Sequence, residues 1–596
     1  MHLVQSVLLH EFVLEMPRGL EHIGVPGPDF ITEQLSCCED PEEWISRFQS
    51  DNSVLLPSLR PALPLIDLHD IPRREFHSSL IEVLKEQFRK CLDDVGKNTS
   101  PKKEAGESSG EKSEPTLGNN PVILSLVEKN FVLIDFEPLQ DILFDALSRL
   151  PEIPENILTK IEKNKLIYRH KLCALSVKRQ IWQKNQNLFG EEISPLLSEY
   201  IKSKEAVMYS TSEQNSFMTS APKLRRQGSV VKRLTEFIGD NIHLYDVILQ
   251  FLRTLFVKTQ NVHYCTLRTE LLMKFHDEEK KLITNVDPCY RFTWCMDACL
   301  KEREVDSKRA KEMCNFVHSL KKDQSRVLGD VSMIVCDPYT VNTLVHSVFR
   351  QLQVLANRKG QFPKRNDDTL LLLRLLTLGI SAWEIIDKQN FKEPKVDPKI
   401  ISNFCPSLLC LFVDDLIKPV EDNVEKMNKL IDPAGMLKLE ASKKSEQVSD
   451  SIYSEEIPAA FTEGIENSKI AVHIAGAYLN HLARTKNQLA LLRVLNSVIQ
   501  ADTKLPYSDM FQHQFIFSLA GMAENFRNDA KFRNFIFEQY LLPKTKKDSV
   551  LRHSLRLLFL LQRKLTRNVF DDLCNQFKPP EKCSQITDEL YRKLFL

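Results

Sequence analysis

The stretch from Leu244 to Phe256 carries apolar side chains at the spacing of an amphipathic α-helix. An apolar residue recurs every three or four positions, so these side chains share one face of the helix. They are Leu244, Ile248, Phe251, Leu252, Leu255 and Phe256. The opposite face carries the polar side chains Asp246, Gln250, Arg253 and Thr254. The pattern therefore predicts a helix that packs along one side against a core.

Helical periodicity of this kind recurs along the chain with short breaks. Apolar stripes occur around residues 81–92, 161–182, 332–355, 471–482, 491–499, 511–526 and 550–565. Glycine makes up only 17 of the 596 residues, against a usual ~7%, which disfavours the glycine-rich turns of nucleotide-binding α/β folds and β-sandwiches. No repeat of fixed length is present, so we predict an all-α fold, an irregular HEAT/armadillo-like helical-repeat scaffold. For the short run of residues 131–136, periodicity leaves both helix and strand open.

Polar stretches indicate how the chain is divided. Residues 97–120 are rich in Ser, Gly, Lys and Glu, and they have too little to bury to offset the entropy of ordering, so we predict a disordered insertion there. Residues 436–456 are predicted to be a linker. This linker would separate an N-terminal helical scaffold of residues 19–435 from a C-terminal helical module of residues 457–596.

Charge and cysteine content narrow the class of function. The 80 basic and 80 acidic residues give a formal net charge of zero, which argues against a dedicated polybasic nucleic-acid binder. The 14 cysteines accompany a start without the features of a secretory signal, so we expect reduced thiols in the cytosol or nucleus. The longest apolar stretch, residues 370–383, is interrupted by Arg374 and is shorter than the ~20 residues of a membrane span. We therefore expect no membrane partner.

Catalytic and metal-binding motifs are absent from the sequence. It contains no phosphate-binding loop, dinucleotide fingerprint, nucleophile elbow or H-E-x-x-H motif. One group of potential zinc ligands lies close together in sequence: His263, Cys265, Cys289, Cys295 and Cys299. The group lacks the C-x-x-C spacing of a zinc site, and aromatic residues lie among the cysteines, which favours buried cysteines that act as small apolar side chains. We predict no enzyme activity, metal, cofactor or small-molecule substrate, and we place Trp182, Phe292 and Trp294 in the core.

Two basic clusters are candidates for contacts with RNA or with an acidic partner, since lysine and arginine bind phosphates with release of counterions. The first comprises Lys160, Lys163, Lys165, Arg169, Lys171, Lys178 and Arg179. The second comprises Lys223, Arg225, Arg226, Lys232 and Arg233. Solvated helix faces are commonly this basic, so that alternative stays open. Ser229, three residues after Arg226, is a candidate phosphorylation site or, alternatively, a helix N-cap.

Five colinear runs carry a family resemblance. They are VLLPSLRPALPLIDLH at residues 54–69, VKRQIWQKNQNLFG at 177–190, RRQGSVVKRLT at 225–235, DPCYRFTWCMDACLKEREVDSKRAKE at 287–312 and VLGDVSMIVCDP at 327–338. Together with the helix at 244–256, these runs resemble the B-subunit family of the negative elongation factor (NELF). The familiar pattern begins near Gly19, so residues 1–18 read as an N-terminal extension, which could be disordered.

The resemblance implies a nuclear, non-catalytic scaffold. Such a subunit would contact the C/D and E subunits of NELF directly and the A subunit through the complex. It would act on the RNA polymerase II elongation complex together with the DSIF factor, support promoter-proximal pausing, and could contact nascent RNA. The alternative from another class is a nucleic-acid-binding helical-repeat protein that acts on its own. A scaffold should expose an apolar groove, whereas an autonomous binder should expose a continuous basic one.

Overall fold

A computed structural model describes most of residues 121–211, then 220–320, 325–358, 367–417, 457–501 and 507–595, with Met218 and single residues between 82 and 93. Every regular element in these ranges is a helix, and they contain no strand, so the all-α prediction is confirmed. Of the ambiguous run, Phe131 and Ile134 lie in helical turns and the other four residues lie outside the described part. The predicted extension 1–18, insertion 97–120 and linker 436–456 also lie outside it.

Backbone contacts divide the chain into two units, Met1–Phe189 and Gly190–Leu596. The first unit contains short helices around its own core. They are α6 (Pro121–Asn130), α7 (Glu137–Ser148), α8 (Glu155–Lys163), α9 (Lys165–Arg169) and α10 (Leu175–Lys184), and α11 (Gln186–Met208) begins in this unit. Phe144, Ile161 and Ile181 lie in the core. Trp182 is fully buried, as predicted, and its indole nitrogen donates to the Tyr168 hydroxyl at 2.8 Å.

The second unit is a long helical array. Its first half contains α13 (Pro222–Arg225), α14 (Ser229–Ile238), α15 (Ile242–Thr259), α16 (His263–Asp277), α17 (Lys281–Val286), α18 (Tyr290–Glu302), α19 (Ser307–Ser319), α20 (Ser325–Cys336), α21 (Pro338–Arg358), α22 (Asp367–Ile380), α23 (Ala382–Asp387), a π-helical segment (Ile400–Phe404) and α24 (Cys405–Ile417). Its second half contains α27 (Ala459–Asn467), α28 (Lys469–Arg484), α29 (Gln488–Gln500), α30 (Asp509–Ala520), α31 (Ala523–Asn528), α32 (Ala530–Asn534), a π-helical segment (Phe535–Leu541), a short 3₁₀ turn (Leu542–Lys544), α33 (Asp548–Leu561), α34 (Arg567–Gln576) and α35 (Gln585–Lys593).

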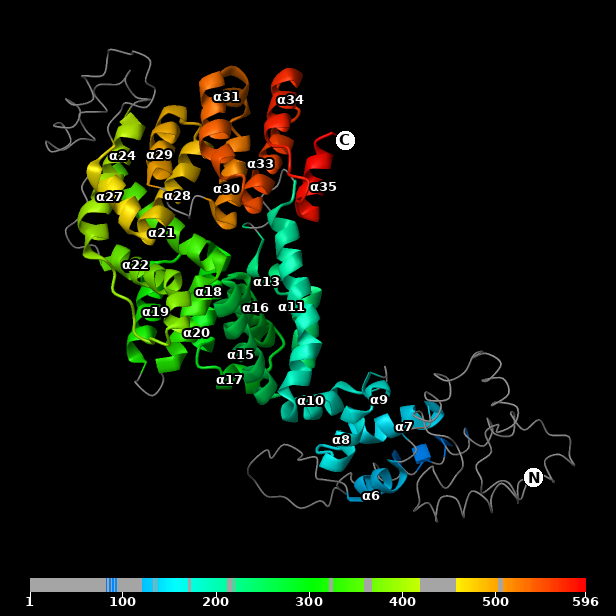
Figure 1. Ribbon diagram of the computed structural model, residues 1–596. Coiled ribbons are helices and arrows are strands. Elements are labelled where there is room, and N and C mark those ends of the chain that lie inside the picture. Colours follow the sequence, from blue (N-terminus) through cyan, green and yellow to red (C-terminus); the bar gives the residue numbers. More distant parts are fainter. Residues whose placement is uncertain are drawn as a thin grey trace, which may run out of the picture. The chain divides into compact units, whose positions relative to one another are not determined.

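Helices that are neighbours in sequence lie side by side in this unit, and the colour passes along the stack from green through yellow to red (Figure 1). In several places a helix also packs on the helix two positions further along the chain: α14 on α16, α20 on α22, α28 on α30 and α33 on α35. This pattern is typical of helical-repeat arrays, in which each helix pair buries its apolar face against the next pair.

The helix predicted from residues 244–256 is α15. Leu244, Ile248, Leu252 and Phe256 are buried, while Phe251 and Leu255 are partly buried. The helix starts where the Asn241 side chain accepts a hydrogen bond from the Leu244 backbone nitrogen at 3.1 Å, as an N-cap does. On the polar face, Arg253 forms an ion pair with Asp330 of α20 at 2.7 Å. The amphipathic pattern thus predicts both the helix and its buried side.

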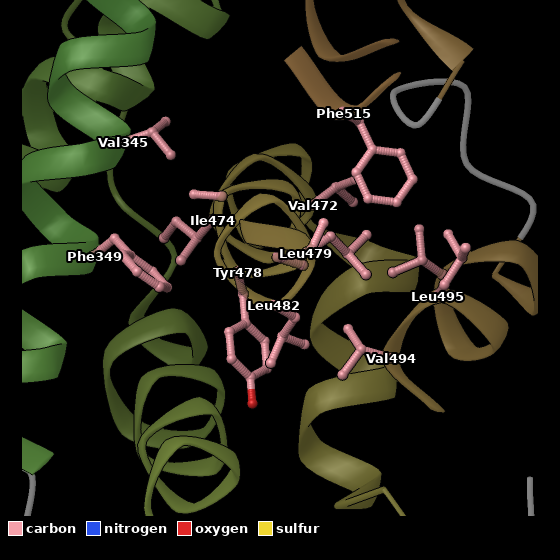
Figure 2. Packing of buried hydrophobic residues seen from close by; sticks show 14 of the residues in the cluster. Val345, Phe349, Val472, Ile474, Tyr478, Leu479, Leu482, Val494, Leu495 and Phe515 are labelled. Carbon is pink, nitrogen blue, oxygen red and sulfur yellow. The ribbon is translucent and has the colours of Figure 1, made fainter. Parts of the chain in front are cut away.

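Helix α28 lies at the centre of the large core, surrounded by α21, α29 and α30 (Figure 2). Ile474 and Tyr478 face Phe349 of α21, and Leu479 faces α29. The helices of residues 457–595 therefore share one core with those of residues 325–417. The predicted linker 436–456 separates these two segments along the chain, but their described helices pack together.

The prediction that Trp294 is a core residue is wrong. Phe292 is buried as predicted, but the Trp294 side chain is 55% exposed. Helix α18 directs Phe292, Cys295, Met296 and Cys299 inward. These positions are three or four residues apart, so position 294 falls on the opposite side of the helix. A tryptophan on the outer face therefore remains in solvent.

Candidate partner-binding groove

A groove of about 680 Å³ lies within the second unit. We call it the central groove. Its walls come from the end of α11, the turn between α15 and α16, the start of α21, the end of α22, α28 and the start of α30. These elements span residues 205 to 547, so only the folded array brings them together.

The lining of the central groove is mostly apolar. Its apolar side chains include Met208, Val341, Ile380, Met510 and Phe511. The walls formed by α22 and α28 contribute Gly379, Gly476 and Ala477. The absence of a side chain at Gly379 and Gly476 lets Val335 and Phe511 approach closely, since a Cβ would lie 2.8 and 3.0 Å from them. Methionine has a flexible, unbranched side chain that adapts to the shape of a partner. This combination suits the apolar face of a helix or an extended segment from another protein.

Polar groups line the edges of the groove, and several of them are bonded to one another. The Gln514 side-chain amide nitrogen donates to the side-chain oxygen of Asn342 at 2.8 Å. Lys547 donates to the backbone oxygen of Tyr507 at 3.0 Å. Asp509 accepts a hydrogen bond from the Tyr209 hydroxyl at 2.9 Å. These contacts satisfy polar groups without a ligand, so they leave apolar contact as the main force available to a partner.

Two histidines of the groove are neutral at physiological pH. Burial, helped by the nearby Lys204, lowers the pKa of His263 to about 4. Burial, helped by Lys469, also lowers the pKa of His473 to about 4. Because a buried imidazolium would lose its hydration, both rings stay unprotonated. The groove therefore offers neutral hydrogen-bonding groups beside its apolar surface.

Buried polar contacts hold the walls of the groove in place. Glu270 of α16 accepts a hydrogen bond from the Tyr200 hydroxyl at 2.8 Å and pairs with Lys204 at 3.0 Å, which joins α11 to α16. Thr266 donates to Asp337 at 2.8 Å, which joins α16 to the start of α21. Since unpaired buried polar groups are costly, these bonds favour one arrangement of the helices.

The cysteines of the predicted zinc candidate group lie in the core. Cys265, Cys289, Cys295 and Cys299 are all buried. His263 lines the central groove. Within the described ranges no group of three or more His, Cys, Asp or Glu side chains is arranged to hold a metal ion. Cys289, Cys295 and Cys299 pack among apolar residues of the large core, as small apolar side chains do.

The first basic cluster lies on α8, α9 and α10 of the first unit. Lys160, Lys163 and Arg169 are exposed, whereas Lys178 and Arg179 are partly buried. The Lys178 ammonium lies 5.0 Å from the centre of the Tyr168 ring. The side chain of Lys165 and the whole of Lys171 lie outside the described part. The cluster thus keeps three exposed cations, and its contact with RNA stays a prediction.

The second basic cluster divides into surface and structural members. Lys223, Lys232 and Arg233 are exposed. The Arg225 guanidinium lies 3.5 Å from the centre of the Tyr339 ring. Arg226 is only 6% exposed and pairs with Asp277 at 2.6 Å and with Asp297 at 2.8 Å. Arg225 and Arg226 therefore hold α13 against its neighbours, so a phosphate would have to displace contacts that already exist.

Ser229 is exposed and is the first residue of α14. The alternative prediction that Ser229 is the N-cap is wrong, because Gly228 occupies that position and Ser229 is already helical. The structure thus leaves the Ser229 hydroxyl accessible at a helix start, where negative charge is favourable. Phosphorylation at Ser229 stays a prediction.

An apolar groove is expected of a scaffold, but the residues that line the central groove are not among the candidates that the sequence indicates. Met208, Ile380 and Met510 lie far apart in sequence, and none of them falls within the apolar stripes that the sequence shows. The candidate residues chosen from the sequence were charged, whereas the groove is apolar. Across the parts of the chain that the structure describes, no helix is both long and apolar enough to cross a membrane.

A multi-helix array with a mostly apolar groove belongs to the class of helical-repeat proteins, whose grooves suit protein partners. The family model described as "Cofactor of BRCA1 (COBRA1)" matches residues 137–500. The chain is 41% identical to negative elongation factor B of Mus musculus and of Homo sapiens, over 97% of its own length and 94% of theirs. It is 38% identical to negative elongation factor B of Drosophila melanogaster, over 97% of its own length and 91% of that protein. The chain belongs to the negative elongation factor B family.

Proposed function

We propose that this chain is the non-catalytic scaffold subunit of a negative elongation factor complex. The observation that supports this most strongly is the 41% identity to negative elongation factor B along nearly the whole chain. In this role it supports promoter-proximal pausing of RNA polymerase II in the nucleus. Its contribution is binding energy applied to one state of the elongation complex, with no chemical step of its own.

The proposed contacts with other subunits follow from this role. The chain bridges the C/D and E subunits directly and reaches the A subunit through the complex, and the complex acts together with the DSIF factor. The central groove supports such bridging, because an amphipathic segment of a partner could bury apolar side chains between Met208, Val341 and Met510. Each large apolar side chain that the groove buries fully contributes roughly 1.5–3 kcal/mol, which offsets part of the free energy that association costs.

The test is co-expression with the C/D and E subunits of the same organism, followed by size-exclusion chromatography with mass detection. We expect a stoichiometric complex that survives high salt, since salt screens exposed charges but leaves apolar contacts intact. A wild-type chain that stays alone in the presence of both subunits would contradict the scaffold role.

The groove itself is tested with a charge placed in its lining. In Met510→Glu the new carboxylate lies in a half-buried lining position, so we expect loss of one partner subunit from the complex. Leu489→Glu on α29 is the matched control, since Leu489 is 57% exposed and does not line the groove. Circular dichroism reports whether both variants keep their helices. Retention of both partners by a folded Met510→Glu chain would exclude the groove as the docking site.

A second function, contact with nascent RNA, is favoured by the exposed cations Lys160, Lys163 and Arg169 on the first unit. Replacing these three by glutamate should weaken RNA binding and reduce the dependence of affinity on salt, because fewer counterions are released. Suppose instead that the wild-type chain binds neither the C/D nor the E subunit, but binds single-stranded RNA with an affinity that depends steeply on salt. The alternative function, an autonomous nucleic-acid-binding protein, would then describe the chain better than the scaffold does.

A further inference from the structure

We propose that the outer face of α18, together with α13, docks an acidic segment of another protein that carries an exposed apolar or aromatic side chain. We call this face the Trp294 surface, and its residues are Lys223, Leu224, Arg291, Trp294, Ala298 and Lys301. It is separate from the lining of the central groove, and the inference does not depend on the proposed function.

The apolar part of the Trp294 surface consists of two side chains. Trp294 is 55% exposed and Leu224 is 64% exposed, both among the large apolar residues that the structure leaves in solvent. Tryptophan is enriched among the residues that contribute most to protein–protein binding, because it buries a large rigid area at low entropic cost. An exposed tryptophan on α18 and an exposed leucine on α13, which packs on α18, therefore provide two anchors for a partner's apolar side chains.

The two anchors lie on helices that are held together. α13 packs on α18, and Arg226 at the end of α13 pairs with Asp297 at 2.8 Å. Asp297 is three residues after Trp294, about one turn along the same helix. The same Arg226 bonds both carboxylate oxygens of Asp277, at 2.6 and 3.2 Å. This buried arginine fixes the short helix that carries Leu224 against the helix that carries Trp294.

The outer face of α18 is continuous along the helix. Arg291, Trp294, Ala298 and Lys301 follow at spacings of three and four residues, whereas Phe292, Cys295, Met296 and Cys299 face the core. Ala298 is small and partly exposed, so it leaves room for a partner to approach between Trp294 and Lys301. The face is thus a shallow strip with basic residues at both ends.

Charge indicates the chemistry of the partner. Lys223, Arg291 and Lys301 are exposed, and within the part of the chain that the structure describes none of them pairs with a carboxylate within 4.0 Å. The neighbouring carboxylates are already engaged, Asp277 and Asp297 by Arg226 and Glu302 by Arg309. An acidic partner would therefore find cations that have no carboxylate in contact.

A peptide fits this surface better than a nucleic acid does. Single-stranded nucleic acids stack their bases on aromatic rings, but an aliphatic side chain offers no stacking plane. Leu224 is 64% exposed, and an aliphatic side chain is stabilised most by contact with another apolar side chain. The combination of leucine, tryptophan and flanking cations matches an amphipathic segment with Glu or Asp beside its apolar residues.

The test measures binding of the full-length chain to a fluorescein-labelled acidic peptide of about 15 residues, built from Glu, Asp, Leu and Phe as an amphipathic helix. A peptide with Lys in place of Glu and Asp, and an oligo-uridine RNA, serve as competing probes. We expect the acidic peptide to bind. We expect neither the lysine peptide nor the oligo-uridine RNA to displace it. No binding of the acidic peptide to the wild-type chain, or its displacement by RNA at equal concentration, would overturn the proposal, and the latter would assign the surface to nucleic acid.

Variants locate the contact. We expect Trp294→Ala and Arg291→Glu each to weaken binding of the acidic peptide at least tenfold. Leu489→Ala should leave binding unchanged, because Leu489 is similarly exposed but lies on α29. Arg291 is exposed, so Arg291→Glu keeps the chain folded and the proposal testable if Trp294→Ala proves unstable. Equal affinity of the wild type and both surface variants would show that the peptide binds elsewhere and would refute the proposal.

Discussion

Arg268 and Asp287 form an ion pair sealed inside the second unit, with side chains only 2% and 1% exposed. The Arg268 Nη2 atom lies 3.2 and 3.0 Å from the two carboxylate oxygens of Asp287. Asp287 also accepts hydrogen bonds from the Tyr245 hydroxyl at 2.5 Å and from the Cys289 backbone nitrogen at 2.8 Å. One carboxylate therefore joins α15, α16 and the start of α18.

Removing one partner of this pair should be costly. Asp287→Ala leaves the Arg268 charge buried without its carboxylate, and we expect a loss of about 3–5 kcal/mol in unfolding free energy. The double variant Arg268→Met/Asp287→Leu should recover part of that loss, because it removes both charges and fills the space with apolar groups. The recovery is incomplete because Tyr245 and Cys289 lose their acceptor. Urea denaturation followed by circular dichroism measures the three proteins. A double variant as unstable as the single one would show that the pair contributes more than charge compensation.

The two tryptophans Trp182 and Trp294 should respond differently to truncation. Trp182→Ala removes a fully buried ring and its bond to Tyr168, so we expect a loss of about 3–5 kcal/mol. Trp294→Ala removes a ring that is 55% exposed, and the loss should be well below half of that. Thermal unfolding of both variants gives the comparison, and a larger effect at Trp294 would contradict its position on the outer face.

Two glycine positions form a matched pair. A Cβ at Gly464 would lie 2.5 Å from Phe404, whose ring stacks on Phe461 with centres 5.4 Å apart. Gly464→Ala should therefore displace that ring and lower the unfolding free energy by about 1–3 kcal/mol. A Cβ at Gly228 would meet only a backbone oxygen at 3.6 Å, so Gly228→Ala should cost no more than about 1 kcal/mol, the preference of an N-cap for glycine over alanine. Similar unfolding midpoints for the two variants would rule out the close approach at Phe404.

Stability should fall with pH between about 6.5 and 4. Burial lowers the pKa of His513 to about 3 and those of His263 and His473 to about 4. Because the unfolded chain binds a proton near 6.5 and the folded chain resists it, the stabilisation is complete above pH 6.5 and is lost as pH falls toward the folded pKa. At pH 5 the loss is on the order of 1–2 kcal/mol for each histidine.

Unfolding midpoints in urea at pH 7 and pH 5 measure this dependence. His473→Gln should reduce the difference between the two midpoints, because glutamine does not titrate, and His243→Gln is the control at an exposed histidine. A pH dependence that stays the same in His473→Gln would show that this histidine does not contribute.

What the sequence determined by itself is the set of helices and their buried sides. The 3.6-residue period is a property of neighbouring residues, so α15 could be predicted with its inward side chains Leu244, Ile248, Leu252 and Phe256. The scarcity of glycine also indicates an all-α fold, and the family resemblance predicts the function. The aromatic character of Trp294 predicts burial, whereas its position in the period of α18 places it on the outer face.

Only the tertiary structure decided which surfaces are open and which charges are engaged. Met208, Ile380 and Met510 form one groove because helices far apart in sequence pack together, and local periodicity carries no information about such distances. Arg226 looked like a surface cation beside Lys223, yet it is buried between Asp277 and Asp297. Those carboxylates lie about 50 and 70 residues away, and desolvation makes their pairing with Arg226 necessary. A buried charge requires a partner, and only the folded chain determines which residue that is.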